Sequence, residues 1–538
     1  MKPKITLTVP ERKALRLAVL CLALLGGAGL FFGYANPFAQ IPALVLLLPA
    51  VLAVFSRIMP SAKGCFYAGW LTATIGNSAC LYWLSVPMHD FGLIPWPLTA
   101  PIIMALGAYL GLYGGVFAWL YRRCREKLPF MTALLLAAPL WATTEIVKGW
   151  LFTGFPWVNL ATSFLPWNDW VQAASVLGAE GLSGVFALAA VALAEARPVR
   201  AGFISMQLPK RKKLACYATA VLSMTAVYAC SFIPALPEGR QISVGLIQGN
   251  VDQNQKWEPA YQLATLERYL TLSEWTVNPE LGRIPSEKDK ADLIVWPETA
   301  MPFYLESNPY LASKIIDFSN KFEVPVAFGA PGKPADAAVY GYHNRLWLQT
   351  PGPGALQAYD KTHLVPFGEY VPLNIPIPFV EYLMQGVSFI PGTNTAPLQT
   401  GDLALGSLIC YEAIFPAIAR ERVAAGANIL VNISNDAWFG NTSAPVQHLH
   451  LTAMRAIEQG RYVVRATNTG ISAVITPKGR VAFHGSLFRA EALIGSARLV
   501  SGTTIFHAVS PFIIGFCLIA SLAALLAVRG KKEPLAEE

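Results

Sequence analysis

One cysteine, Cys410, stands apart from the other seven because it alone lies in the polar stretch between Gln241 and Val500. Cys410 ends the apolar run Ala404–Ile409 and precedes Tyr411, Glu412 and a predicted helix. A strand-to-helix turn presents its side chain at the edge of a sheet, and a helix N-terminus favours a thiolate. The position predicts a nucleophile. The alternative, a small buried hydrophobic residue, is the commoner role of a lone cysteine.

Two charged residues hold comparable positions. Glu298 follows the apolar strand-like run Leu293–Pro297, and Lys361 follows Ala358–Asp360. A carboxylate after a fully apolar strand is either a helix cap or a base at the edge of a sheet. A lysine after Tyr-Asp is, taken alone, a solvated turn residue.

The composition of the chain that must position these residues indicates that much of it lies in a membrane. Hydrophobic residues make up 54% of it, charged residues 14%, and its mean hydropathy is +0.43. A soluble enzyme of this length is nearer a quarter charged. Runs apolar enough to cross a bilayer lie near residues 14–33, 40–58, 65–86, 95–121, 130–147, 170–194, 214–234 and 506–528. The first reads as a signal anchor rather than a cleaved signal peptide.

The net charge of +8 is unevenly placed. Between Gln241 and Val500 there are 19 Lys and Arg against 22 Asp and Glu, so no basic domain is present that could bind nucleic acid. The basic excess lies in alternate short loops, which predicts that both termini are cytoplasmic and the long segment periplasmic. We therefore expect a seven-span membrane domain (1–238), a periplasmic catalytic domain (239–500), and an eighth span with a cytoplasmic tail (501–538).

The periplasmic segment reads as a layered α/β domain, because short apolar strands alternate with helices. The sequence contains no phosphate-binding glycine motif and no internal repeat, so nucleotide binding has no support. The expected strands are Ile242–Gln248, Leu293–Trp296, Val324–Gly329, Arg345–Gln349, Leu405–Ile409, Ile429–Ile433, Tyr462–Ala466 and Ser472–Thr476. The expected helices are Glu258–Trp275, Pro309–Phe322, Phe415–Ala425 and Pro445–Gln459.

Four stretches of this segment resemble the nitrilase superfamily and its Glu-Lys-Cys triad. They are Trp296–Ala300 (WPETA), Tyr359–Tyr370 (YDKTHLVPFGEY), Ile409–Glu412 (ICYE) and Val431–Phe439 (VNISNDAWF). With the eight apolar runs, almost the whole chain resembles the bacterial apolipoprotein N-acyltransferases of the inner membrane. The resemblance implies an αββα catalytic fold and no cofactor. It also implies transfer of an acyl chain from a membrane phospholipid to the N-terminal amine of diacylglyceryl-modified apolipoproteins, the last step of lipoprotein maturation.

The resemblance assigns roles that acyl-transfer chemistry explains. Glu298 would take the proton of the Cys410 thiol and later that of the attacking amine. Lys361, with a backbone N–H beside Cys410, would stabilise each oxyanion. Glu369 resembles the family's second glutamate, which holds Lys361 in register, although a solvated loop carboxylate is the alternative. Tyr411 and Glu412 flank the nucleophile, and Glu412 reads equally well as a carboxylate in the first turn of a helix.

Aromatic and apolar loops suggest where lipids would bind. The proline-rich stretch 371–390, with Phe379, Tyr382 and Leu383, is predicted to be either a mobile lid over Cys410 or a packed surface loop. Trp257 is a substrate-contact candidate or a core residue. The loop from Trp150 to Trp170 reads as an interfacial aromatic belt or as part of a lipid route.

Competing functions remain at this stage. A metal site has little support, because His448 and His450 point apart on a helix and no ligand lies at suitable spacing. A membrane-tethered amidase or nitrilase would use the same triad, with water as the acceptor. A transporter or receptor would be favoured by charge pairs inside the membrane, of which the apolar runs carry almost none.

Overall fold

The structure, a computed structural model, describes residues 8–530 except 202–203, 254, 283, 285, 287–288, 337, 339, 354–355 and 372–388. The chain forms two compact units. A helical unit runs through Ser85, Ile94–Ile233 and onward from Ala508, and a second unit comprises Val86–Leu93 and Pro234–His507. The sequence analysis placed Val86–Leu93 in the membrane part. These residues instead group with the second unit, where the Phe91 ring contacts Trp438 edge-on at 4.6 Å.

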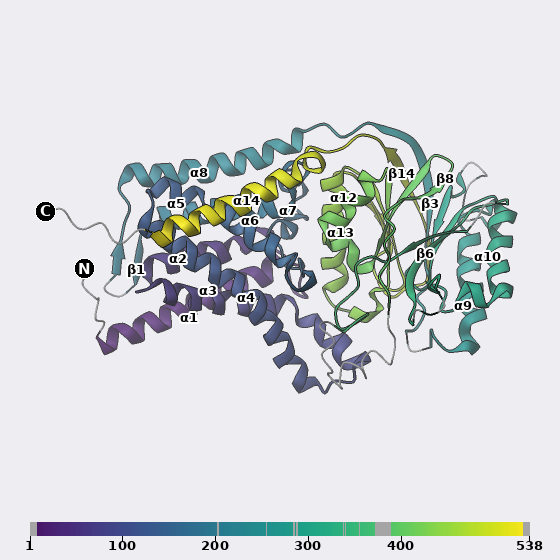
Figure 1. The fold of residues 1–538 in the computed structure, drawn as a ribbon, viewed down its shortest axis with the longest axis horizontal. Helices are drawn as coiled ribbons and strands as arrows, with labels where there is room; N and C mark the ends of the chain where they lie inside the picture. Colours follow the sequence, from purple (N-terminus) through teal and green to yellow (C-terminus); the bar gives the residue numbers. More distant parts are fainter. Residues whose placement is uncertain are drawn as a thin grey trace. The chain divides into compact units, whose positions relative to one another are not determined.

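Each predicted apolar run overlaps helix, mostly in the first unit (Figure 1). The helices are α1 (Val9–Gly33), α2 (Leu47–Ile58), α3 (Ala62–Cys80), α4 (Trp96–Lys127), α5 (Phe130–Leu135), α6 (Ala137–Lys148), α7 (Ala174–Ala196), α8 (Lys210–Ala229) and α14 (Ile505–Gly530). In the described part of the chain, six helical segments are long and apolar enough to cross a membrane. Those six are α1, α4, α5 with α6, α7, α8 and α14. Helices α2 and α3 fall outside that set, so the eight-span arrangement stays a prediction.

Helices α3 and α4 approach closely because small residues line their contact. A methyl group at Gly107 or Gly111 of α4 would overlap Ser78 or Thr74 of α3. At Gly114 it would lie 2.6 Å from the Ala73 Cβ. Closely packed backbones of this kind drive helix association in lipid, where apolar burial contributes little.

The charges at the end of α6 are buried by the aromatic segment that follows it. The Glu145 carboxylate accepts hydrogen bonds from the Trp141 ring N–H at 2.9 Å and the Leu160 N–H at 3.1 Å. The Lys148 ammonium donates to the Val158 carbonyl. Trp157 is buried, whereas Trp150 is exposed. The predicted aromatic belt is therefore partly a packed core that satisfies two charges.

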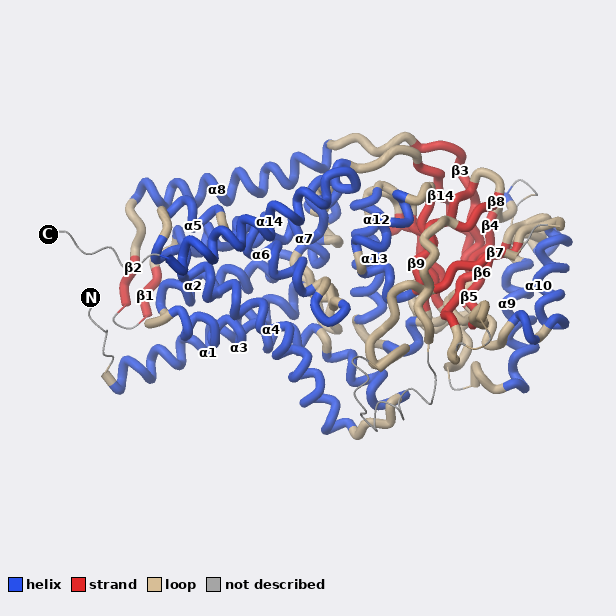
Figure 2. Tube along the Cα trace, viewed as in Figure 1, coloured by secondary structure: helices blue, strands red, loops and turns tan. Residues whose placement is uncertain are grey.

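In its described residues, the second unit has four layers, with two helices, two six-stranded sheets and two further helices (Figure 2). One sheet has the order β14-β3-β4-β5-β6-β7 and the other β13-β12-β11-β10-β9-β8. The first consists of β3 (Glu238–Gln248), β4 (Leu293–Val295), β5 (Val326–Gly332), β6 (His343–Gln349), β7 (Gln357–Asp360) and β14 (Glu491–Val500). The second consists of β8 (Leu398–Thr400), β9 (Leu403–Ile409), β10 (Ile429–Ser434), β11 (Val463–Thr467), β12 (Ala473–Ile475) and β13 (Val481–His484).

Alternating side chains explain the layers. In β4, Leu293 and Val295 pack in the core shared by the two sheets, whereas Ile294 packs in a second core with helices α9 (Gln262–Glu274) and α10 (Pro309–Phe322). Helices α12 (Pro416–Ala424) and α13 (Ala444–Gln459) belong to the other sheet's side. Successive residues of a strand point to opposite faces, so strands apolar throughout are buried on both sides.

The expected α/β fold is confirmed, and all eight expected strands and all four expected helices coincide with observed ones. Strands β7, β8, β13 and β14 were not predicted. Three of them have only three or four residues, and β14 contains Gly495, Ser496 and Arg498 within ten residues. Such segments become strands through pairing: β14 lies antiparallel along β3.

We expect Gly111→Ala to destabilise the helical unit by roughly 1–3 kcal/mol, because the new methyl group overlaps Thr74. This loss exceeds the gain of about 1 kcal/mol from alanine's better helix propensity. Thermal unfolding of the purified protein in detergent measures the effect. Gly515→Ala is the matched control, since a methyl group there meets nothing within 4 Å. Equal unfolding midpoints for the two variants would contradict the packing argument.

Candidate active site

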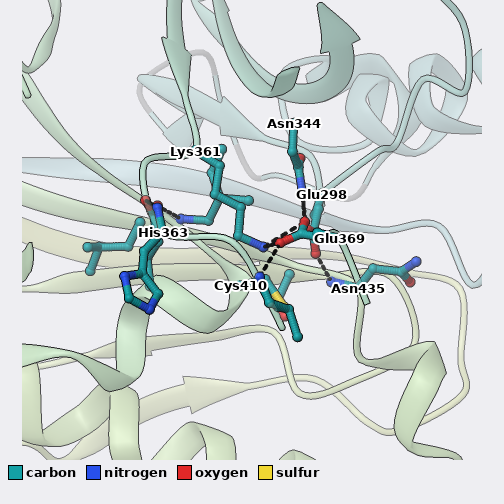
Figure 3. A network of polar contacts seen from close by, with 12 residues as sticks. Glu298, Asn344, Lys361, His363, Glu369, Cys410 and Asn435 are labelled. Carbon is teal, nitrogen blue, oxygen red and sulfur yellow. Dashed lines mark hydrogen bonds and ion pairs between the residues drawn. The ribbon is translucent and has the colours of Figure 1, made fainter. Parts of the chain in front are cut away.

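Glu298, Lys361 and Cys410 each lie within three residues after a strand, namely β4, β7 and β9. Strand β4 is parallel to β5, and two antiparallel pairings turn β7 back into the direction of β5. Glu298 and Lys361 therefore leave the same edge of one sheet, while Cys410 leaves the other sheet. Figure 3 shows the side chains of Glu298, Lys361 and Glu369 meeting beside Cys410.

The Glu298 carboxylate is only 6% exposed and has a defined partner for each oxygen. Its Oε1 accepts from Asn344 Nδ2 at 2.6 Å, and its Oε2 accepts from the Asn435 N–H at 2.9 Å. Burial raises the pKa of Glu298, and the Lys361 ammonium partly offsets that rise. A carboxyl group in this environment is suited to take up a proton and return it.

Lys361 forms an ion pair with Glu369. Its Nζ lies 2.9 Å from Glu369 Oε1, 2.8 Å from Oε2 and 3.8 Å from Glu298 Oε1. Burial alone would lower the pKa of Lys361, but Glu369 and then Glu298 outweigh it and raise that pKa. The ammonium is therefore a permanent cation and not a base. Glu369 is itself held by the Val365 N–H at 2.7 Å and by Asn344 at 3.0 Å.

The structure corrects the expectation that a helix N-terminus makes Cys410 a thiolate. The residues after β9 form a short 3-10 turn, Cys410–Ile414, and the α-helix begins only at Pro416. Burial raises the pKa of the Cys410 thiol, Glu298 raises it further, and Lys361 opposes both. The resting thiol is neutral, so its proton must leave as it attacks. Glu298 is the carboxylate that interacts with it most strongly.

Glu412 ties the two sheets together beneath the site. It is fully buried, and its Oε1 accepts from Tyr359 Oη at 2.7 Å, the Thr362 N–H at 2.7 Å and the His363 N–H at 3.2 Å. Its Oε2 accepts from the Ile409 N–H at 2.7 Å. Glu412 thus links the loop that carries Lys361 to the strand that ends at Cys410. The reading as a first-turn carboxylate is confirmed for the 3-10 helix Cys410–Ile414, where Glu412 accepts from the N-cap residue Ile409, whereas its link to the Lys361 loop was not predicted.

Of the remaining predicted residues, the structure describes Tyr411 and Trp257. The Tyr411 ring packs against Phe415 at 5.0 Å and His363 at 5.8 Å between ring centroids, and Tyr411 is 7% exposed. Trp257 is 46% exposed, which excludes the core reading and leaves it available to a ligand. Phe379, Tyr382 and Leu383 lie outside the described residues.

Two residues of the site were missed from the sequence. Asn344 bridges Glu298 and Glu369 from β6, and nothing in the sequence marks an uncharged residue at a strand start as part of a charged site. Lys256 is 1% exposed, and its Nζ lies 3.4 Å from the Glu298 main-chain oxygen. Its position next to Trp257, which was already a substrate-contact candidate, was the sequence feature that could have pointed to Lys256.

Comparison with known proteins decides the family. The model of the apolipoprotein N-acyltransferase N-terminal domain matches residues 26–192, and that of the carbon-nitrogen hydrolases matches residues 243–502. An apolipoprotein N-acyltransferase from Geobacter metallireducens is 34% identical over 529 residues, covering 98% of each chain. One from Shewanella oneidensis is 32% identical over 85% of this chain and 86% of its own. The chain belongs to the apolipoprotein N-acyltransferase family.

As a member of this family, the protein is an acyltransferase with a nitrilase-like catalytic unit and a multi-pass helical membrane unit. Among solved structures, an amidase of the nitrilase superfamily from Nesterenkonia sp. AN1 is 18% identical. The match covers 49% of this chain and 93% of the amidase, with a TM-score of 0.35.

Lys256→Met is expected to make this N-acyltransferase more stable at pH 7, by up to roughly 3 kcal/mol, because it removes a charge that burial penalises. Burial lowers the pKa of Lys256 to about 8, whereas the unfolded chain keeps its proton to about pH 10.5. The wild type therefore gains stability relative to Lys256→Met as the pH rises from about 8 to 10.5.

Unfolding midpoints of the wild type and of Lys256→Met between pH 7 and 10 measure this difference in stability. Lys321→Met serves as the control, because the Lys321 side chain is 67% exposed and its loss should change little. A Lys256→Met protein less stable than the wild type at pH 7, or a difference that does not narrow with pH, would contradict the argument.

Proposed function

We propose that this enzyme transfers an acyl chain from a membrane phospholipid to the N-terminal amine of the S-diacylglyceryl-cysteine of apolipoproteins, through a thioester on Cys410. The observation that carries the proposal is the convergence of Glu298, Lys361 and Glu369 beside Cys410 in a member of this family. A base, a fixed cation and a thiol are the groups that two-step acyl transfer requires.

In the first step, Glu298 takes the proton from Cys410 Sγ as the sulfur attacks the ester carbonyl of the phospholipid. The carbonyl oxygen becomes an oxyanion, which the Lys361 ammonium and the N–H of Tyr411 stabilise. One donor of this kind lowers a barrier by roughly 3 kcal/mol. The intermediate then expels the glycerol oxygen, which takes the proton from Glu298, and the lysophospholipid leaves.

In the second step, the amine of the diacylglyceryl-cysteine attacks the thioester carbonyl. Glu298 takes the amine proton, a second oxyanion forms beside Lys361, and its collapse breaks the C–S bond. The sulfur leaves as a thiolate and recovers the proton from Glu298, so the site returns to its starting state. Glu298, Lys361 and Glu369 are each at most 8% exposed, whereas Cys410 is partly exposed. The thiol is therefore the group of the site that a substrate carbonyl can reach for the reaction.

The enzyme would work at the periplasmic face of the inner membrane. Two short basic stretches, Arg122–Arg125 and Lys210–Lys213, begin or end predicted spans on one side, while the short loops on the other side carry few Lys or Arg. Positive loops stay in the cytoplasm, which puts both termini there and the catalytic unit outside. Phospholipid and lipid-anchored acceptor would then reach Cys410 from the same leaflet.

The purified enzyme, given phospholipid and a synthetic S-diacylglyceryl-cysteine peptide, should produce N-acyl peptide and one lysophospholipid per peptide acylated. Mass spectrometry and lipid chromatography measure both products. Glu298→Gln should slow the transfer by roughly 10²–10⁴-fold, the usual value of a positioned base. Free fatty acid as the main product, or turnover of a small lipid-free amide at a comparable rate, would identify a hydrolase and refute the proposal.

A further inference from the structure

A second buried polar cluster lies behind the nucleophile, and the chemistry above does not use it. It consists of Ser434 at the end of β10, Asp436 just after it, Arg465 of β11 and His448 of α13. Each of these four residues is at most 1% exposed. The cluster reaches Cys410 at two points: the Ser434 side chain forms a hydrogen bond with Cys410, and His448 Nε2 lies 3.2 Å from the Cys410 main-chain oxygen.

The anion of the cluster is fully engaged. Asp436 Oδ2 accepts from Arg465 Nη2 at 2.6 Å, and Asp436 Oδ1 accepts from Ser434 Oγ at 2.7 Å. Burial would raise the pKa of Asp436, but Arg465, His448 and Ser434 together outweigh it and hold that pKa well below its usual range. Asp436 is therefore charged, and Arg465 is its counter-ion.

The contacts of His448 fix its tautomer. Its Nε2 faces a carbonyl oxygen, which can only accept, so Nε2 carries a hydrogen. Its Nδ1 lies 3.2 Å from both Arg465 Nη2 and Asp436 Oδ1. Burial, and next the Arg465 charge, lower the pKa of His448, so the ring is neutral and Nδ1 accepts from Arg465. Asp436 Oδ1 accepts the hydrogen of the Ser434 hydroxyl.

This hydrogen bond acts on a strained turn. Cys410 has a φ of 49°, a conformation that costs a residue with a side chain about 1–3 kcal/mol and persists only when its surroundings enforce it. In a trans peptide the C=O and the following N–H point in opposite directions. Holding the Cys410 carbonyl on the side of α13 therefore aims the Tyr411 N–H to the opposite side of the same peptide plane.

We propose that His448 is a positioning residue that orients the Cys410–Tyr411 peptide, so that the Tyr411 N–H serves with Lys361 as an oxyanion donor. The proposal deepens the proposed function and rests on it only in requiring a tetrahedral intermediate on Cys410. It is independent of whether an amine or water attacks the thioester.

Two reagents separate this role from a general structural one. Iodoacetamide alkylates a thiol by displacement, forms no oxyanion and reports the reactivity of Cys410 alone. A long-chain aldehyde adds to the thiol to give a hemithioacetal: the C–S bond forms, the carbonyl oxygen becomes the oxyanion, and Glu298 holds the thiol proton. Its Kd, measured by protection of Cys410 against iodoacetamide, therefore reports the oxyanion donors.

His448→Ala should weaken aldehyde binding and slow acyl transfer by roughly 10²-fold, with KM for phospholipid and the alkylation rate each within about twofold of the wild type. His450→Ala is the matched control on the same helix and should change neither. Equal losses of alkylation and aldehyde binding in His448→Ala, or no loss of either, would overturn the proposal.

If His448→Ala does not fold, a second pair of variants decides. Glutamine places its amide N–H near the position of Nε2, whereas asparagine places it near Nδ1. His448→Gln should therefore bind the aldehyde at least tenfold more tightly than His448→Asn, at equal alkylation rates. Equal aldehyde affinities in these two variants would overturn the proposal. Wild-type transfer to the peptide tests the function separately, because no His448 variant enters that measurement.

Discussion

The ammonium of Lys361 lies between two buried carboxylates, and the rest of the site depends on that arrangement. Glu369 lies 2.8 Å from it and Glu298 3.8 Å from it. Because the two distances differ, the two carboxylates have different roles. Glu369 holds the lysine in place, whereas Glu298 has a raised pKa and is able to accept a proton. A single buried cation thus provides a fixed positive charge and also leaves one base free. The neutral Cys410 thiol completes the set without adding a charge to the resting site.

The fold supplies this geometry by joining the ends of two sheets. Glu298 and Lys361 leave one sheet and Cys410 leaves the other, so a shift of either sheet would separate base from nucleophile. Glu412 opposes such a shift, because one oxygen binds the loop after Lys361 and the other binds the strand before Cys410. Removing one partner of a buried, hydrogen-bonded charge leaves the others unsatisfied, so this link is costly to break. The carboxylates around Lys361 hold the charged groups, and Glu412 holds the loop and the strand that carry Lys361 and Cys410.

Much of the catalytic unit could be predicted from the sequence, because its strands are apolar on both faces and its helices are amphipathic. The positions of Glu298 and Cys410 after strands could be predicted for the same reason, whereas Lys361 follows β7, a strand that was not predicted, and was identified from its motif alone. Asn344 and Lys256 were not predicted, since their importance comes from burial beside Glu298, which only the packing of β6 and the Lys256 segment reveals. The expected α-helix N-terminus at Cys410 was wrong, because a short 3-10 turn follows the nucleophile. The sequence indicates a helix after it, but burial next to Glu298 decides its pKa.

The acyl group on Cys410 is the central claim, and trapping it tests the claim most directly. The purified enzyme is incubated with phospholipid and no acceptor, digested, and analysed by mass spectrometry. We predict that the peptide containing Cys410 gains the mass of one acyl chain, that hydroxylamine removes it, and that Glu298→Gln does not acquire it at the wild-type rate. An unmodified Cys410 peptide, together with full transfer activity in Cys410→Ala, would contradict the account.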